Sequence, residues 1–329
     1  MNIFSHSLFD TAVSIFISWA LFSLLCSYIH ETIAQIKEER GRFLKQRLLK
    51  QFQDLPNGIN WASLLYLHGA VNMLSRKFNK PPYEISVEVF AKTIIEVVGN
   101  AHLVQINENS TTDTYQNVSL RNYKKAVGCL QHSDMLALFE QSLKDAENKN
   151  LKEGRLQEDG VYLDLLLNLQ TWYQNFLAQV SDWYKKKTRR RLFMIGTLIA
   201  MLLNVDSIEL FKHFNTDETS RKTLIAFYTE NKASLEQQAL EISNLDAVPQ
   251  STPTLTKLKV ISAQLDSLSK EAELPVGFNR NFYSQIHKAD DIEHILMKLL
   301  GFLLSGFAVS FGAPFWFELL KKIYTKKTN

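Results

Sequence analysis

The chain has 329 residues, of which 46% are apolar and 22% are charged, and these two classes are concentrated in different stretches of the sequence. The net charge of +3 is too small to indicate nucleic acid as the partner, and the two cysteines, Cys26 and Cys129, cannot form a disulfide framework. The long uncharged stretches instead predict a mainly α-helical integral membrane protein.

The first uncharged stretch covers the nineteen residues from Thr11 to Ile29. A helix rises about 1.5 Å per residue, so this stretch nearly matches a hydrocarbon core of about 30 Å and predicts a transmembrane helix. Unlike a cleaved signal peptide, it has no Lys or Arg before it, whereas the segment Glu31–Lys50 after it contains six. Because basic residues stay on the cytoplasmic side, the N-terminus is expected outside.

The second uncharged stretch, Leu192–Val205, has only fourteen residues, so a buried helix or a re-entrant segment is an alternative to a transmembrane helix. A basic cluster directly before it favours a span that begins on the cytoplasmic side, where the cluster would also attract anionic lipids. The cluster consists of Lys185, Lys186, Lys187, Arg189, Arg190 and Arg191.

The third uncharged stretch, Leu299–Phe317, is followed by a lysine-rich tail that is expected in the cytoplasm. An outside N-terminus and a cytoplasmic C-terminus require an odd number of crossings, which favours three spans. A third stretch that enters the membrane and returns would leave a single span. Near its end, Pro314 is expected to bend the helix, and Trp316 with its aromatic neighbours is expected at the membrane interface.

These stretches divide the chain into six predicted segments. They are an external N-terminus with the first transmembrane helix (1–30), a helical cytoplasmic domain (31–191), a second transmembrane helix (192–211), an external helical hairpin (212–291), a third transmembrane helix (292–318) and a basic cytoplasmic tail (319–329).

Apolar spacing also predicts the helices within the two polar segments. Those of the cytoplasmic domain are Trp61–Phe78, Val87–Val98, Lys124–Glu147 and Asp159–Lys187, and the last is compatible with a continuous helix into the second span. The hairpin is expected to consist of Thr216–Asn244 and Thr254–Ala272. The second of these helices has the a/d spacing of a coiled coil, so its apolar seam lies either within an ordinary hairpin or between subunits.

No short motif with a known catalytic mechanism is present, so a non-enzymatic protein is favoured over an enzyme, and no cofactor is expected. One cluster has the spacing of a metal site, because its members would share a helical face at i, i+3, i+4 and i+7. It consists of His287, Asp290, Asp291 and His294. The favoured interpretation is a polar helix start, whose acidic residues are stabilised by the helix N-terminus.

Two further groups of residues lie in or near the predicted spans. Asp206 and Glu209, at the outer end of the second span, either line an ion path or cap the helix at the membrane interface, and the second interpretation is favoured. The third span contains two pairs of small residues at i, i+4, which would allow another helix to approach closely. These pairs are Gly301 with Ser305 and Gly306 with Ser310.

Four stretches taken together resemble one family, namely Ser23–Phe52, Leu65–Val98, Ser181–Leu210 and Ser310–Lys322. The last is the most specific, because it contains Gly-Ala-Pro-Phe-Trp-Phe followed by an acidic residue and two leucines. In these residues the chain is similar to a family of uncharacterised bacterial integral membrane proteins. The resemblance implies a location in the bacterial inner membrane and a similar architecture, and it implies no activity and no catalytic residues.

Large helical segments on both sides of a membrane, without a catalytic motif, are typical of a membrane-anchored interaction or assembly protein. The alternative is an oligomeric channel or a membrane-perturbing effector that is gated by the cytoplasmic domain. Both hypotheses predict a bilayer with anionic lipids and other proteins as partners, self-association included, and neither predicts nucleic acid.

Overall fold

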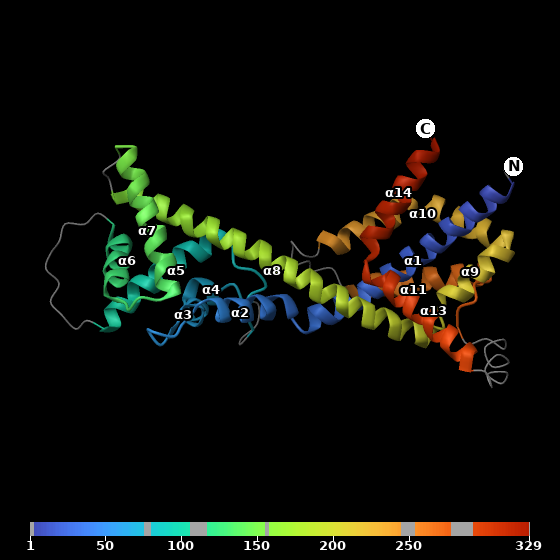
Figure 1. The fold of residues 1–329 in the computed structure, drawn as a ribbon, viewed down its shortest axis with the longest axis horizontal. Coiled ribbons are helices and arrows are strands. Elements are labelled where there is room, and N and C mark those ends of the chain that lie inside the picture. Colours follow the sequence, from blue (N-terminus) through green and yellow to red (C-terminus); the bar gives the residue numbers. More distant parts are fainter. Residues whose placement is uncertain are drawn as a thin grey trace. The chain divides into compact units, whose positions relative to one another are not determined.

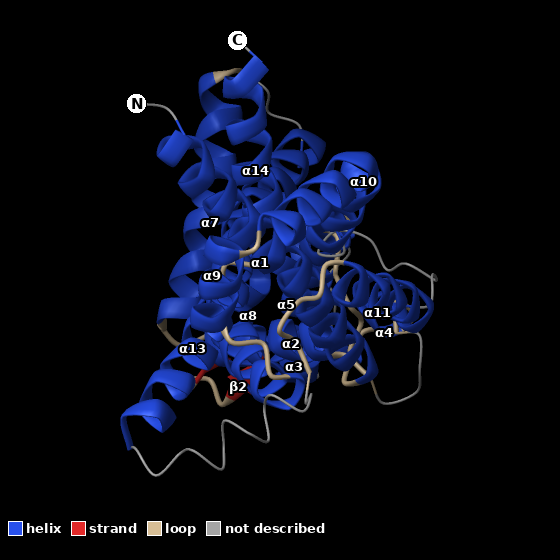
Figure 2. Cartoon of the chain, turned by 90° about the vertical axis from the view of Figure 1, so that its right-hand side faces the viewer, coloured by secondary structure: helices blue, strands red, loops and turns tan. Residues whose placement is uncertain are grey.

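The computed structural model describes residues 3–75, 80–105, 117–154, 158–244, 254–277 and 292–328. These residues are mainly helical, with one pair of short strands, which confirms the predicted mainly α-helical class (Figure 2). The chain forms two compact units. Unit 1 comprises residues 1–37 and 185–329, and unit 2 comprises residues 38–184.

Unit 2 consists of short and medium-length helices and one β-hairpin. Its elements are α2 (Glu39–Gln51), β1 (Gln53–Asp54), β2 (Ile59–Asn60), α3 (Trp61–Leu67), α4 (Gly69–Asn72), α5 (Val87–Gln105), α6 (Val118–Cys129), α7 (Asp134–Lys152) and the first part of α8 (Glu158–Leu203). The two strands pair in the antiparallel direction, with Asp54 opposite Ile59. The helix α8 continues without a break from unit 2 into unit 1 (Figure 1).

Two predicted helices of unit 2 are interrupted, and capping residues explain both breaks. The predicted helix Trp61–Phe78 stops at Leu67, because His68 is extended (φ −64°, ψ 136°) and its side chain accepts a backbone N–H of α4. The predicted helix Lys124–Glu147 is divided into α6 and α7, and the Ser133 hydroxyl caps α7 by accepting one of its first N–H groups. Such caps satisfy N–H groups that have no partner within the helix.

The core of unit 2 is rich in aromatic side chains. Phe90 stacks on Tyr173 with ring centroids 3.8 Å apart, and the buried indole N–H of Trp61 donates to the Asp54 carboxylate at 3.0 Å. Tyr123 is fully buried, and its hydroxyl donates to a backbone carbonyl of α7 at 3.2 Å. Burial raises the pKa of Tyr123 well above its ordinary range, because the charged phenolate would lose its hydration.

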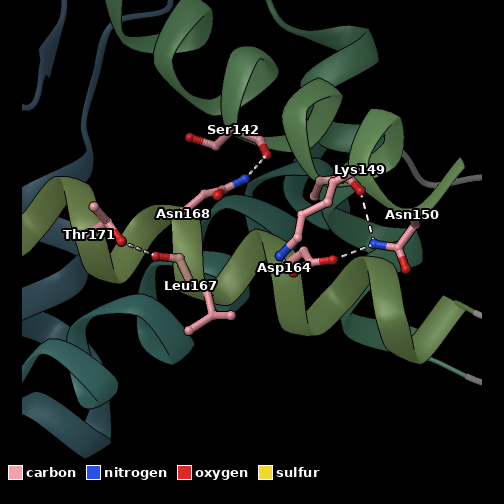
Figure 3. A network of polar contacts seen from close by, with 8 residues as sticks. Ser142, Lys149, Asn150, Asp164, Leu167, Asn168 and Thr171 are labelled. Carbon is pink, nitrogen blue, oxygen red and sulfur yellow. Dashed lines mark hydrogen bonds and ion pairs between the residues drawn. The ribbon is translucent and has the colours of Figure 1, made fainter. Parts of the chain in front are cut away.

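A polar clamp joins α7 to α8 within unit 2 (Figure 3). The buried Asp164 carboxylate accepts hydrogen bonds from Asn150 Nδ2 and Lys149 Nζ, both at 2.6 Å. Further along α8, Asn168 Nδ2 donates to the Ser142 carbonyl at 3.0 Å. Because a buried carboxylate without partners would be costly, these bonds favour one register of α8 against α7.

Unit 1 is a helical bundle with α1 at its centre. Its elements are α1 (Ile3–Ile36), the last part of α8, α9 (Ser207–Thr216), α10 (Glu218–Asn244), α11 (Thr254–Glu271), α13 (Ile292–Ser310) and α14 (Ala313–Thr328). The central helix packs against α9, α10, α11, α13 and α14 (Figure 1). Every residue from Ala20 to Tyr28 is buried, so the other helices cover this part of α1 on all sides.

Among the described residues, α1 is the one helix that is long and apolar enough to cross a membrane. The number of possible spans rises to as many as three if each of two bent helix pairs is counted as one span.

Both bent pairs lie in the second and third uncharged stretches. In the second stretch, α8 ends where Asn204 is left-handed (φ 53°) and the Val205 N–H donates to the Ala200 carbonyl at 2.8 Å. The pair α8 and α9 is therefore bent by 59°. The third stretch breaks at Gly312 (φ 83°), two residues before Pro314, and α13 and α14 meet at 85°. The predicted spans 192–211 and 292–318 are thus not straight helices.

The two helices of the predicted hairpin correspond to α10 and α11, and both pack against α1. The a/d residues of α11 point into the core of unit 1, where Ile261, Leu268 and Ala272 are buried, so the seam packs within the chain. The opposite faces of α10 and α11 are charged, and the side chains of Lys222 and Lys270 are 76% and 73% exposed. Side chains of this kind require contact with water.

Candidate functional site

On helix α13, the distribution of small and large apolar side chains is the reverse of that on a surface helix of a water-soluble protein. Most of the residues that face the other helices of unit 1 are small: Gly301, Ser305, Gly306 and Ala308 are buried, together with the larger Val309. Apart from Glu293 in the first turn, the exposed residues are large and apolar, and nine of them are 38–75% exposed. These nine are Ile292, Ile295, Leu296, Met297, Leu299, Leu300, Leu303, Leu304 and Phe307.

The small residues of α13 allow close contacts with the end of α8. Gly306 lies against Thr197, so that a Cβ atom at position 306 would lie only 2.9 Å from the Thr197 backbone nitrogen. Ser305 donates from its hydroxyl to the Val205 carbonyl at 2.8 Å, between α8 and α9. The hydroxyl of Ser310, in contrast, donates to a carbonyl of its own helix at 2.6 Å.

Asp206 is the cap of α9. Its Oδ1 accepts the N–H groups of Ile208 at 2.9 Å and Glu209 at 3.3 Å. The Asp206 side chain is buried against Gly301, and a Cβ atom at that glycine would clash with the carboxylate. The Glu209 carboxylate lies 3.8 Å from the Lys298 ammonium of α13. Both acids therefore contribute to the junction of α9 and α13, while their position relative to a membrane stays a prediction.

A chain of hydrogen bonds that sequence reasoning missed joins three helices at this junction. The indole N–H of Trp19 on α1 donates to the Ser207 hydroxyl of α9 at 3.0 Å, and this hydroxyl lies 2.7 Å from that of Ser305 on α13. Ser207 and Ser305 are 98 positions apart in the sequence. The spacing of apolar residues along the chain contains no information on a pairing between distant residues. The only available signal was the presence of polar residues in or next to apolar stretches.

The outward face of α13 has a counterpart at the end of α8. Five large apolar residues of α8 after the basic cluster are 37–65% exposed, namely Met194, Leu198, Met201, Leu202 and Leu203. The contact of Gly196 with Val309 brings α8 and α13 together, and we name the exposed apolar residues of both helices the apolar flank. Transfer of one such half-exposed side chain into hydrocarbon gains on the order of 1 kcal/mol, and the whole flank on the order of 10 kcal/mol.

The basic cluster directly precedes the apolar flank on α8. Lys185, Lys186, Arg189 and Arg190 are exposed, and Lys187 and Arg191 are half-buried. The Arg189 guanidinium carbon lies 6.0 Å from the ring centroid of Phe311, in the break between α13 and α14. This contact places the cluster beside the end of α13 at which the outward apolar face stops.

Trp316, which the sequence predicts at the membrane interface, is not among the exposed aromatic side chains, and its position relative to a membrane stays a prediction. It is 5% exposed, its ring centroid lies 5.0 Å from that of Trp19, and its N–H donates to a backbone carbonyl of α13 at 2.7 Å. Because α14 leaves α13 at 85°, this indole faces the bundle. Near the break between α13 and α14, the exposed aromatic residues are Phe307 and Phe315, which are 56% and 43% exposed and both pack against Phe311.

The predicted metal cluster cannot be placed in this way. His287, Asp290 and Asp291 lie outside the described residues, and so does the side chain of His294. Within the described part of the chain, no group of three or more His, Cys, Asp or Glu side chains could hold a metal ion.

No family model matches the chain, and no curated protein or solved structure does so either. The resemblance to a family of bacterial membrane proteins therefore stays a prediction.

Proposed function

We propose that the protein is a membrane-anchored interaction or assembly protein. Unit 1 holds the chain on a lipid bilayer through its apolar flank, and unit 2 is the helical domain that binds a protein partner in the aqueous phase. In this proposal the membrane is the bacterial inner membrane, with the N-terminus outside. Unit 2, the basic cluster and the C-terminus are in the cytoplasm.

The inversion of α13 is the observation that supports this proposal most strongly. In water, the large apolar side chains of a helix turn toward the protein core, because burial of apolar area is favourable. Hydrocarbon removes this preference, so that small residues line the close helix contacts and large apolar side chains face the lipid. The buried Gly301 and Gly306 and the exposed Leu300 and Leu303 follow the pattern of a helix in lipid.

Unit 2 has the opposite arrangement. Its large side chains, among them Trp61 and Phe90, form the core, and its surface has exposed ion pairs such as Lys92 with Glu88 at 2.6 Å. Such charged side chains are favourable on a surface in contact with water. A domain of this type, held at a membrane by unit 1, can bind a protein partner without leaving the bilayer, which favours an interaction or assembly role.

The anchoring function can be tested by removal of apolar side chains from α13. Leu299 and Leu303 are 41% and 38% exposed and one turn apart, and we expect Leu299→Asp with Leu303→Asp to release much of the protein from membranes on alkaline extraction. Each charge in hydrocarbon costs roughly 3 kcal/mol by insertion scales. The matched control is Leu163→Asp with Leu167→Asp, an exposed pair with the same spacing in the unit 2 part of α8.

The control variant is expected to remain in the membrane pellet together with the wild type. Limited proteolysis of unit 2 verifies that both variants are folded. Equal retention of the two variants would refute the role of the apolar flank, and extraction of the wild type itself would refute membrane anchoring.

A second candidate function, that of a membrane-perturbing effector, is favoured by the position of α1. This helix is long and apolar enough to cross a bilayer, yet residues Ala20–Tyr28 are buried, and two of the helices that cover α1 have charged outer faces. In this candidate, α10 and α11 move away from α1, and the face of α1 that they cover becomes exposed to the bilayer. Planar-bilayer recordings of the full chain test it: steady conductance steps would support the effector, and a silent bilayer with inserted protein would exclude a pore.

A further inference from the structure

The apolar flank has an abrupt chemical boundary on α8. Arg190, Met194, Leu198 and Met201 follow one another at i, i+4, i+8 and i+11, so they lie on one face of the helix. All four side chains are exposed. The face therefore changes from basic to apolar within one helical turn, between Arg190 and Met194.

Three aromatic side chains, Phe307, Phe311 and Phe315, lie together beside the end of α13, next to the basic end of this boundary. The ring centroid of Phe311 is 5.1 Å from that of Phe307 and 4.9 Å from that of Phe315, and the Arg189 guanidinium lies over the Phe311 ring. Phe307 is the last exposed residue of the outward face of α13. Aromatic rings next to basic side chains are characteristic of the depth at which lipid head groups begin.

The charge of this region is of one sign along α8. The basic cluster contains six Lys and Arg residues, and no acidic residue occurs between Asp182 and Asp206. Arginine is suited to phosphate, because its planar guanidinium offers paired N–H donors at its edge. A guanidinium that stacks on an aromatic ring keeps this edge available for a second partner.

We propose that Arg189 and Arg190 bind the phosphate of an anionic phospholipid, while the acyl chains of that lipid lie along the apolar flank. This inference rests on the proposed membrane anchoring and adds the class of lipid that is preferred. A phosphate group and an apolar chain, joined in one molecule, match the basic and the apolar part of the same helix face. A net negative charge on the lipid distinguishes it from phosphatidylcholine, whose choline group repels the two arginines.

The test is vesicle flotation of the purified full chain, added from detergent to vesicles of phosphatidylcholine alone or mixed with phosphatidylglycerol. The test variant is Arg189→Gln with Arg190→Gln. The control variant, Lys222→Gln with Lys270→Gln, removes the same charge from the exposed faces of α10 and α11. A basic residue near an anionic surface contributes roughly fivefold in binding, so the arginine variant should lose about 25-fold of its preference for anionic vesicles.

The control variant should keep the preference of the wild type. An arginine variant with the wild-type preference, or a control that loses as much, would overturn the proposal. Inorganic phosphate in solution should not release the protein, and release by phosphate would assign the arginines to free phosphate instead of lipid. Wild-type protein that binds both kinds of vesicle equally would refute the lipid class alone. Wild-type protein that binds neither would refute membrane anchoring.

Discussion

The helices α8 and α13 are so close at Gly306 that the addition of a single methyl group there tests their contact. The substitution Gly306→Ala would place a Cβ atom 2.9 Å from the backbone nitrogen and 3.0 Å from the Cα of Thr197. The Thr197 hydroxyl can rotate away from this methyl group, but its backbone atoms cannot, so the two helices have to separate. Overpacking of this kind costs about 1–3 kcal/mol.

The same substitution also has a favourable effect, because replacing glycine within a helix stabilises the helix by about 1 kcal/mol. Gly128→Ala in α6 measures this gain separately, since nothing lies within 4 Å of the Cβ atom that it adds. The net expectation for Gly306→Ala is a loss of about 0–2 kcal/mol relative to the wild type. Relative to Gly128→Ala, the expected loss is the full cost of overpacking.

Thermal unfolding of the full chain in detergent micelles, followed by circular dichroism, is a suitable assay. For a unit of this size, 1 kcal/mol corresponds to about 2–4 °C in Tm, so Gly306→Ala should unfold roughly 2–12 °C below Gly128→Ala. Equal melting temperatures would show that α8 and α13 do not meet at this glycine. They would also remove the basis for the inverted packing of α13.

Three further changes have defined expectations. Asp206→Ala removes the cap of α9 and should cost about 1 kcal/mol, whereas Asp206→Asn retains a capping oxygen and should cost only a few tenths, as measured by Tm in micelles. Asp164→Ala removes the carboxylate that accepts from Asn150 and Lys149, so that Asn150 Nδ2 retains only the Ala146 carbonyl among its two acceptors. It should lower the free energy of unfolding of unit 2 by about 1–3 kcal/mol in urea titrations, and an unchanged midpoint would contradict the clamp. Because burial raises the pKa of Tyr123, the folded state keeps a proton that the unfolded state loses above about pH 10, so stability should fall as the pH rises beyond that value. Tyr123→Phe should make this fall shallower, and an identical pH profile would contradict the assignment.

The helical class and the positions of the apolar stretches could be predicted from the sequence because they depend on local composition. The predicted helices Thr216–Asn244 and Thr254–Ala272 differ from α10 and α11 by two residues or fewer at each end. In these segments, apolar spacing and the prolines between the two helices, Pro249 and Pro253, are sufficient to predict the bounds.

The breaks within the helices were not predictable in the same way, because each depends on one or two residues. Asn204 ends α8 in a left-handed conformation, although asparagine occurs in helices as well. The direction in which a side chain points also depends on distant elements. The sequence did not show that the bend at Gly312 turns the side chain of Trp316 toward Trp19.

The bond between Ser305 and Val205 has a consequence for the synthesis of the chain. The two residues are 100 positions apart, so at about 5–20 residues per second the ribosome needs roughly 5–20 s to add Ser305 after Val205. Throughout this interval the end of α8 exists without α13, and both the Val205 carbonyl and the glycine surface that later receives Val309 lack their partners. Correct assembly of unit 1 therefore requires that the end of α8 stays available until α13 has been synthesised. A translational pause before α13 would prolong the exposure of α8 to aggregation and proteolysis.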